Sequence, residues 1–420
     1  MNNQLLHTPD GVRDIYGREC AKKRRIEEAI QEVFHLYGYQ DIETPTFEFF
    51  DIFKAERGSV GTREMYKFFD RDNNTLVLRP DMTPPIARCA AKYYMNEDMP
   101  IRLCYKGSTY NNGASYRGQL KETTQTGVEL IGNDSSDADA EMIAIVIDAL
   151  KATGLREFQV ELGQVEFYRG LVEEAGIPAE IQERLRELIE SKNYFGVEEL
   201  LNQQILKPEL KRLFLKLPEL FGDIEQIRLA KSMTENSRAR KAIERLERVQ
   251  EILDGYGLGE YVSYDLGMLS KYSYYTGIIF KAYTYGTGEY IVTGGRYDRL
   301  LEQFGKKSPA IGLAIMVDPL MMALSSQKIP VAVPTIAALV LYEKSARLSG
   351  IRLATRLRRK GKCVQLTLRR AELGYEDYMA YARRSGICRI LYLDGDGLRI
   401  TAHNLDTGES KIVPCTDDII

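Results

Sequence analysis

Apolar residues recur at helical spacing near the start of the chain. In residues 21–38, Ile26, Ile30, Val33 and Phe34 are three or four positions apart, and a glycine closes the segment. This pattern predicts an amphipathic helix that ends near Gly38. Residues 135–154 predict a second helix, with acidic residues at its positive N-terminal end.

Between and after these helices the pattern predicts strands. Apolar and β-branched runs occupy residues 39–53, 75–83, 101–110, 123–132 and 158–164. A proline inside a strand is tolerated mainly at a sheet edge, so Pro45 is expected at a sheet margin or a subunit contact. A short helix over residues 84–95 is also expected, because proline suits a first helical turn.

The composition and the spacing of apolar residues change over residues 168–255. Amphipathic segments rich in Leu, Glu and Arg predict a helical insertion there. Strand patterns return at 261–269, 274–286, 288–305 and 310–324. We therefore expect residues 1–167 and 256–327 to form one α+β core, an antiparallel-rich sheet with flanking helices. Residues 328–334 are expected to be a linker, and residues 335–420 a small α/β domain.

Composition restricts the functional classes. The chain has 420 residues and a formal net charge of −3, so it lacks the basic excess that favours nucleic-acid binding. Its six cysteines are scattered without a CxxC pair and its three histidines are far apart, which argues against a disulfide framework or a metal site unless folding brings them together. No apolar run is long enough for a membrane span, and the first residues lack the apolar core of a signal peptide. A cytoplasmic location is expected.

One set of residues suits an amino-acid ligand. Polar groups follow the strand at 75–83, two polar residues four apart share one face of the strand at 123–132, and paired tyrosines and paired glycines come later. These candidates are Asp81, Thr83, Gln125, Glu129, Tyr274, Tyr275, Gly294 and Gly295. Acids, an amide, a hydroxyl and an aromatic wall would suit a ligand with an ammonium group and a ring, and the glycines would let backbone approach it closely. Taken alone, the same residues are compatible with a sheet of satisfied polar groups and turn glycines.

Several motifs in fixed order resemble class II histidyl-tRNA synthetases. They are TPDGVRD, ETPTFE, LRPDMT, SYYTGIIF and TGGRYDRLLEQFG. The resemblance implies a class II synthetase-like core with a helical insertion, a reduced anticodon-binding domain at the C-terminal end, and a histidine pocket formed by the eight candidates. It also implies a homodimer, since Pro45 lies in the stretch similar to the class II dimer motif.

The resemblance breaks at the reacting centre. Where the family places arginines at the ATP phosphate, the amino-acid carboxylate and the adenine ring, and an acid in the loop, this chain has neutral residues. These positions are Asn111, Gly113, Gln119, Ser270 and Pro319. Losing one such cation costs roughly 3 kcal/mol of transition-state stabilisation, so aminoacylation is not expected. No cofactor and no metal are expected.

A family similar to these synthetases but without aminoacylation fits this pattern, the regulatory subunits of ATP phosphoribosyltransferase. The resemblance implies a non-catalytic subunit that a short-form catalytic subunit requires at the first step of histidine biosynthesis, where ATP is joined to phosphoribosyl pyrophosphate. Histidine would be its feedback effector, and the two subunits would form a hetero-oligomer. Two alternatives stay open: a divergent histidyl-tRNA synthetase, and a non-catalytic tRNA-binding sensor that uses the basic cluster at 352–362.

Overall fold

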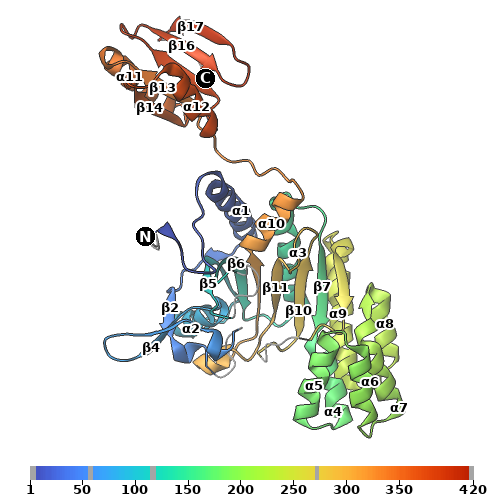
Figure 1. The fold of residues 1–420 in the computed structure, drawn as a ribbon. Helices are drawn as coiled ribbons and strands as arrows, with labels where there is room; N and C mark the ends of the chain where they lie inside the picture. Colours follow the sequence, from blue (N-terminus) through green and yellow to red (C-terminus); the bar gives the residue numbers. More distant parts are fainter. Residues whose placement is uncertain (1–5, 55–59, 114–119, 270–273, 416–420) are drawn as a thin grey trace. The chain divides into compact units, whose positions relative to one another are not determined.

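The computed structural model describes residues 6–54, 60–113, 120–269 and 274–415 (Figure 1). The chain divides into two compact units, Met1–Val331 and Ala332–Ile420. Within the described ranges, no helix is both long and apolar enough to cross a membrane.

In its described residues, the first unit is built on a nine-stranded sheet. The six central strands pair antiparallel, whereas the pairs β1–β5 and β7–β9 are parallel. In spatial order the strands are β1 (Gln40–Asp41), β5 (Ile101–Tyr110), β6 (Glu122–Ile131), β12 (Ala310–Met316), β11 (Val292–Arg296), β10 (Ile278–Tyr283), β7 (Gln159–Gln164), β9 (Val262–Asp265) and β8 (Phe221–Gly222). The predicted α+β class, with a sheet rich in antiparallel pairs, is confirmed.

Helices cover both faces of this sheet. On one face, α1 (Gly17–Leu36) and α3 (Ser136–Ala152) share a core, and α1 contributes the four apolar residues whose spacing predicted it. On the other face, α2 (Thr83–Tyr93) and the short helix η6 (Leu301–Phe304) pack around buried tyrosines. A small sheet accompanies them, in the order β2 (Phe47–Phe49), β4 (Thr75–Leu78) and β3 (Lys67–Phe69), with η2 (Phe50–Ile52) and η3 (Thr62–Glu64) nearby in sequence.

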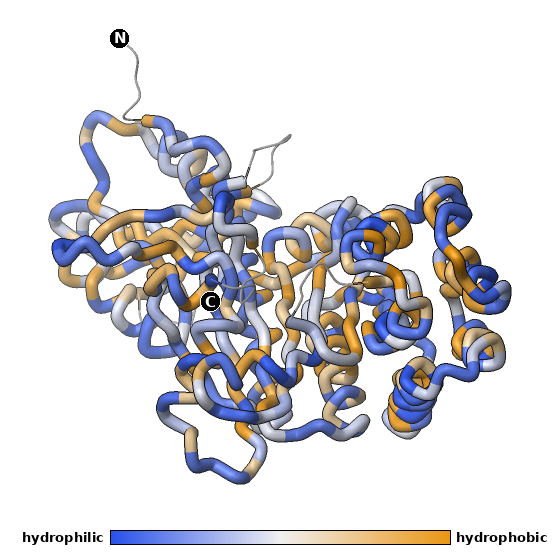
Figure 2. Tube along the Cα trace, turned by 90° about the horizontal axis from the view of Figure 1, so that it is seen from below, coloured by the Kyte–Doolittle hydropathy of each residue, from blue (hydrophilic) through white to orange (hydrophobic). Residues whose placement is uncertain are grey.

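A group of helices lies between β7 and β9 in the sequence. These helices are α4 (Val165–Ala175), α5 (Ala179–Glu190), α6 (Tyr194–Asn202), α7 (Pro208–Lys216), α8 (Ile224–Ser232) and α9 (Ser237–Gly255), with η4 (Leu217–Glu219) before β8 and η5 (Gly259–Tyr261) after α9. Hydrophobic and hydrophilic residues alternate along them, as in helices with one buried face (Figure 2). Their buried side chains join the core on the α3 face of the sheet. Arg245 of α9 also pairs with the fully buried Asp139 of α3 at 2.5 Å.

Several strand predictions were wrong in extent. The pattern over 288–305 gives only β11, and residues after it form the short helix η6. Residues 39–53 form two short strands in different sheets, and Pro45 between them has no N–H to give to a strand ladder. The carbonyls of Thr44 and Pro45 instead accept hydrogen bonds from Arg79, at 2.6 and 3.2 Å. The strand pattern over 310–324 ends at Met316, and α10 (Val317–Ser326) follows with Pro319 tolerated in its first turn.

The second unit is a five-stranded mixed sheet with helices. Its order is β14 (Val364–Leu368), β13 (Ala338–Tyr342), β15 (Arg389–Leu393), β16 (Arg399–Asn404) and β17 (Ser410–Pro414), accompanied by η7 (Lys344–Ala346), α11 (Arg347–Arg359) and α12 (Tyr375–Arg384). The first three strands pair in parallel and the last two antiparallel. The pattern predicted the parallel part but missed the final hairpin, whose residues are largely polar and incompletely buried.

Candidate functional site

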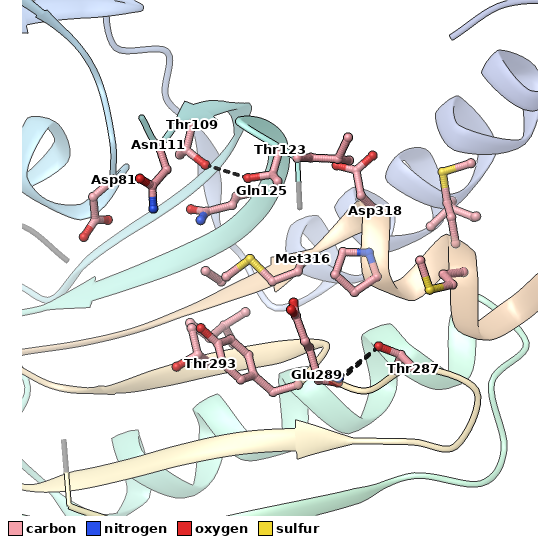
Figure 3. A pocket seen from close by; sticks show the side chains of 18 of the residues that line it. Asp81, Thr109, Asn111, Thr123, Gln125, Thr287, Glu289, Thr293, Met316 and Asp318 are labelled. Atoms are coloured by element: carbon pink, nitrogen blue, oxygen red, sulfur yellow. Dashed lines mark hydrogen bonds between the residues drawn. The ribbon is translucent and has the colours of Figure 1, made fainter. Parts of the chain in front are cut away.

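A cavity of about 1230 Å³ opens in the first unit, over the strands at the middle of the sheet (Figure 3). Strands β5, β6, β11 and β12 supply much of its wall, and α1, α10, residues 287–290 and several loop residues also line it. Such a volume lies above what a single amino acid needs and is typical of sites for larger small molecules.

The structure brings seven of the eight predicted residues to this cavity. They are Asp81, Thr83, Gln125, Tyr274, Tyr275, Gly294 and Gly295. The eighth, Glu129, is only 1% exposed and lies behind the cavity wall. It stands opposite Gly312 in the β6–β12 pair, and Gly312 itself lines the cavity.

Glu129 is held by two hydroxyl donors. Thr83 Oγ1 donates to its Oε1 at 2.8 Å, and the Tyr297 hydroxyl donates a short hydrogen bond to Oε2. Burial raises the pKa of Glu129 to about 8, and the negative charge of Asp81 adds to this shift, while the two hydroxyl donors oppose it. A cation brought close to this carboxyl would therefore favour release of its proton.

The paired tyrosines form an aromatic wall. The rings of Tyr274 and Tyr275 lie 4.7 Å apart between centroids, and Tyr274 also packs edge-on against Tyr297 at 6.3 Å. Consecutive residues of a strand would point to opposite faces, so a regular strand would bring only one of the two rings to the site. Both rings line the cavity, because these residues precede β10, which begins only at Ile278.

The paired glycines make room for protein groups. A Cβ atom at Gly294 would come within 2.5 Å of the Gly312 carbonyl oxygen, and one at Gly295 within 2.7 Å of the Tyr275 ring. In this structure, the close approach that they permit is therefore between neighbouring strands and to the aromatic wall. The expectation that their backbone approaches a ligand stays a prediction.

Two of the positions at which the resemblance predicts lost arginines lie at the cavity. Asn111 and Pro319 both line it, and Figure 3 shows Asn111 on the same side as Asp81 and Gln125. The Asn111 side chain accepts a hydrogen bond from the Gly113 backbone N–H at 2.7 Å, so it is engaged in its own loop. Gln119 and Ser270 lie outside the described residues.

Sequence reasoning missed several groups at the site. Tyr297 and Gly312 shape the surroundings of Glu129, and the only available signal was the GGRYD motif that contains the tyrosine. The N-terminal segment and α1 also line the cavity with charged residues, namely Arg13, Arg18, Glu19 and Lys22. Arg13 pairs with Glu19 at 2.7 Å.

Comparisons with known proteins agree with this geometry. The family model for histidyl-tRNA synthetase matches residues 11–320. The ATP phosphoribosyltransferase regulatory subunit of Acetivibrio thermocellus is 43% identical over 409 residues, which cover 97% of each chain. The chain belongs to the ATP phosphoribosyltransferase regulatory subunit family.

Further relatives support this assignment. The regulatory subunit of Clostridium novyi is 35% identical over 98% of each chain. A Bacillus halodurans structure described as an ATP phosphoribosyltransferase regulatory subunit/histidyl-tRNA synthetase superposes with a TM-score of 0.84 at 31% identity, over 92% of this regulatory subunit and 98% of that chain. The histidyl-tRNA synthetase of Nostoc sp. superposes with a TM-score of 0.81 at 20% identity over 97% of each chain, which shows the shared fold.

The prediction of a non-catalytic ATP phosphoribosyltransferase regulatory subunit, in histidine biosynthesis, is confirmed. The cavity of this regulatory subunit offers the Asp81 carboxylate, the Gln125 amide and two tyrosine rings. Asn111 and Pro319, at two positions where the resemblance predicts lost arginines, are neutral. The arrangement can bind a cationic, ring-bearing molecule better than it can assist adenylate formation.

Proposed function

We propose that this chain acts in the cytoplasm by binding a short-form ATP phosphoribosyltransferase catalytic subunit, which it activates, and that histidine inhibits the complex through the cavity. The observation that carries this proposal is the set of residues that line the cavity. Asp81, Gln125 and the tyrosines are groups suited to histidine, whereas Asn111 and Pro319 are neutral where the resemblance predicts that ATP would need cations.

The recognition of histidine follows from the groups available. Its ammonium would lie near Asp81 and Thr83, above the buried Glu129, and its ring against Tyr274 or Tyr275. Ser270 stands where the resemblance predicts an arginine that would bind the ligand carboxylate. Histidine should therefore bind the isolated chain weakly, with a dissociation constant on the order of tens to hundreds of micromolar, or a binding free energy of about −5 to −6 kcal/mol. Feedback requires that histidine bind two states of the complex with different affinities.

A homodimer forms part of the same proposal. The stretch that resembles the class II dimer motif and β3, two strands of the small sheet separated by β4, leave aromatic side chains exposed on one face: Phe47 is 52% exposed, Phe49 55% and Phe68 37%. Aromatic residues gathered on an exposed sheet are typical of an interaction surface. A second copy of this chain would cover them.

The alternative of a tRNA-binding sensor is less well supported. Its best evidence was the basic cluster around α11, but two of those guanidinium groups bind within the second unit. Arg356 donates to the Cys415 carbonyl at 2.5 Å, and Arg358 donates to the Val364 carbonyl at 3.1 Å. They stabilise the packing of α11, and their availability to phosphates is reduced.

Calorimetry tests the histidine part of the proposal, with the isolated chain and with the complex. At pH 8.5, Glu129→Gln should weaken histidine binding by about 1–3 kcal/mol, the usual contribution of a hydrogen bond to a charged group. Glu251→Gln is the control, because Glu251 is exposed on α9 and does not line the cavity, and should leave the affinity unchanged. If histidine binds only the complex and Glu129→Gln has no effect, feedback acts at another site.

A further inference from the structure

A second group of ligating side chains lies outside the cavity, where α1 ends and β1 begins. It consists of His35, Asp41 and Cys104, each of which offers one donor atom within 4.8 Å of the other two. His35 Nε2 is 3.0 Å from Asp41 Oδ2, and Cys104 Sγ donates to Asp41 Oδ1 at 3.4 Å. The three residues come from three elements, and only the folded chain brings them together.

The backbone fixes this arrangement. Gly38, with a φ of 80°, turns the chain after α1, and its N–H donates to the His35 carbonyl at 2.9 Å. This turn places β1 directly beside the last helical turn. Asp41 then pairs with Cys104 in the parallel β1–β5 ladder, so their side chains project from the same face.

The cluster is open on one side and buried on the other. The side chains of His35 and Asp41 are 48% and 63% exposed, whereas Cys104 is fully buried behind them. Among the described residues, the ionic partner of Asp41 is His35, and no lysine or arginine forms an ion pair with Asp41. An ion arriving from solvent would therefore meet an imidazole and a carboxylate first and a sulfur atom behind them.

We propose that His35, Asp41 and Cys104 bind a divalent transition-metal ion, with Zn²⁺ the best match to a nitrogen, an oxygen and a sulfur donor. Bonds of about 2.0–2.3 Å in a tetrahedron place ligand atoms roughly 3.3–3.6 Å apart. The two contacts of Asp41, at 3.0 and 3.4 Å, are near this spacing, and the donor atoms, which lie within 4.8 Å of one another, would draw together around the ion. A water molecule would occupy the fourth position on the exposed side.

Metal binding would replace two hydrogen bonds by metal–ligand bonds. The ion would take the place of the thiol proton of Cys104, which passes to the buffer, and of the imidazole–carboxylate contact. Burial and the neighbouring Asp41 raise the pKa of the Cys104 thiol to about 12, so without an ion the sulfur keeps its proton. A cation reverses this preference, because it stabilises the thiolate directly.

Co²⁺ titration of the full-length, untagged, chelator-treated chain tests the site. We expect one Co²⁺ per chain, with the charge-transfer absorption of a cobalt–thiolate bond and displacement by Zn²⁺. Cys104→Ser should abolish the charge-transfer band. His35→Ala and Asp41→Asn should each lower the affinity at least about tenfold, since even groups that only support ligands have effects of that size.

Cys388→Ser and His403→Ala, on the second unit, are matched controls and should leave the band and the affinity unchanged. Zn²⁺ should also raise the melting temperature of the native chain and leave that of His35→Ala unchanged. Binding that survives His35→Ala and Asp41→Asn, or an absence of stoichiometric Co²⁺ binding at 100 micromolar, would overturn the proposal. Both side chains are exposed, so these variants keep the test valid if Cys104→Ser does not fold.

Discussion

Thr83 Oγ1 donates a hydrogen bond of 2.8 Å to Glu129, linking a residue that lines the cavity to a carboxyl buried behind its wall. Through this bond, the charge of Glu129 can affect the binding of a ligand that contacts Thr83 but not Glu129 itself. The bond also explains why a buried acid belongs to the site although it does not line the cavity.

Glu129 should make the stability of the chain depend on pH. Its pKa is about 8 when folded, against 4.5 for the ordinary side chain, so between these values the folded chain holds a proton that the unfolded chain has released. The stabilisation is complete below pH 4.5 and is lost as pH rises through 8, with a slope of up to about 1.4 kcal/mol per pH unit. Urea unfolding of the native chain and Glu129→Gln from pH 5 to 9 measures it, and equal slopes would contradict this assignment.

Gly312 should be intolerant of a side chain. A Cβ atom there would lie 1.7 Å from Glu129 Oε2, so Gly312→Ala forces the buried carboxyl away from its donors. We expect a loss of about 1–3 kcal/mol in the free energy of unfolding, typical of overpacking. Gly288→Ala is the control, since Gly288 lines the same cavity and has open space at its Cβ position. Equal free energies of unfolding for the two variants would contradict this expectation, because they would show that Glu129 can move to make room for the added methyl group.

The chain should not activate histidine. With histidine, ATP and Mg²⁺, the purified protein is expected to give no pyrophosphate exchange above background, because Asn111 and Pro319 are neutral where the resemblance predicts that a synthetase needs arginines. Asn111→Arg alone should not restore exchange, since the other cations remain absent. Clear exchange by the native chain would support the synthetase alternative.

The exposed aromatic residues of the small sheet should hold two copies together. Phe49→Glu places a charge where an apolar contact is proposed and should shift the chain from dimer to monomer in light scattering at micromolar concentration. Phe195→Glu, at a residue that is 76% exposed on α6, is the control and should leave the dimer intact. A native chain that is monomeric in the same experiment would remove the dimer from the proposal.

Local pattern was sufficient for many elements of the fold. The strand over residues 101–110 and the buried face of α1 follow from spacing alone. The broken strand at 39–53 could not be resolved in the same way, because its two halves join different sheets and pairing partners are set by tertiary contacts.

The sequence was sufficient to predict which residue types form the site, but not which of them are buried behind the cavity wall. Seven of the eight candidates line the cavity, but the burial of Glu129 depends on its pairing with Gly312, which is remote in the sequence. The convergence of His35 with Cys104 was hidden for the same reason, since neither residue carries a spacing signal.

The central claim is that this chain activates a catalytic partner, and one assay tests it most directly. A short-form ATP phosphoribosyltransferase catalytic subunit is assayed alone, with this chain, and with this chain plus histidine. We predict co-elution of the two subunits, a rise in rate of more than about fivefold, the lower end of usual coupling between sites, and inhibition of the complex by histidine. Separate elution with an unchanged rate, using a catalytic subunit that responds to another regulatory subunit, would contradict the account.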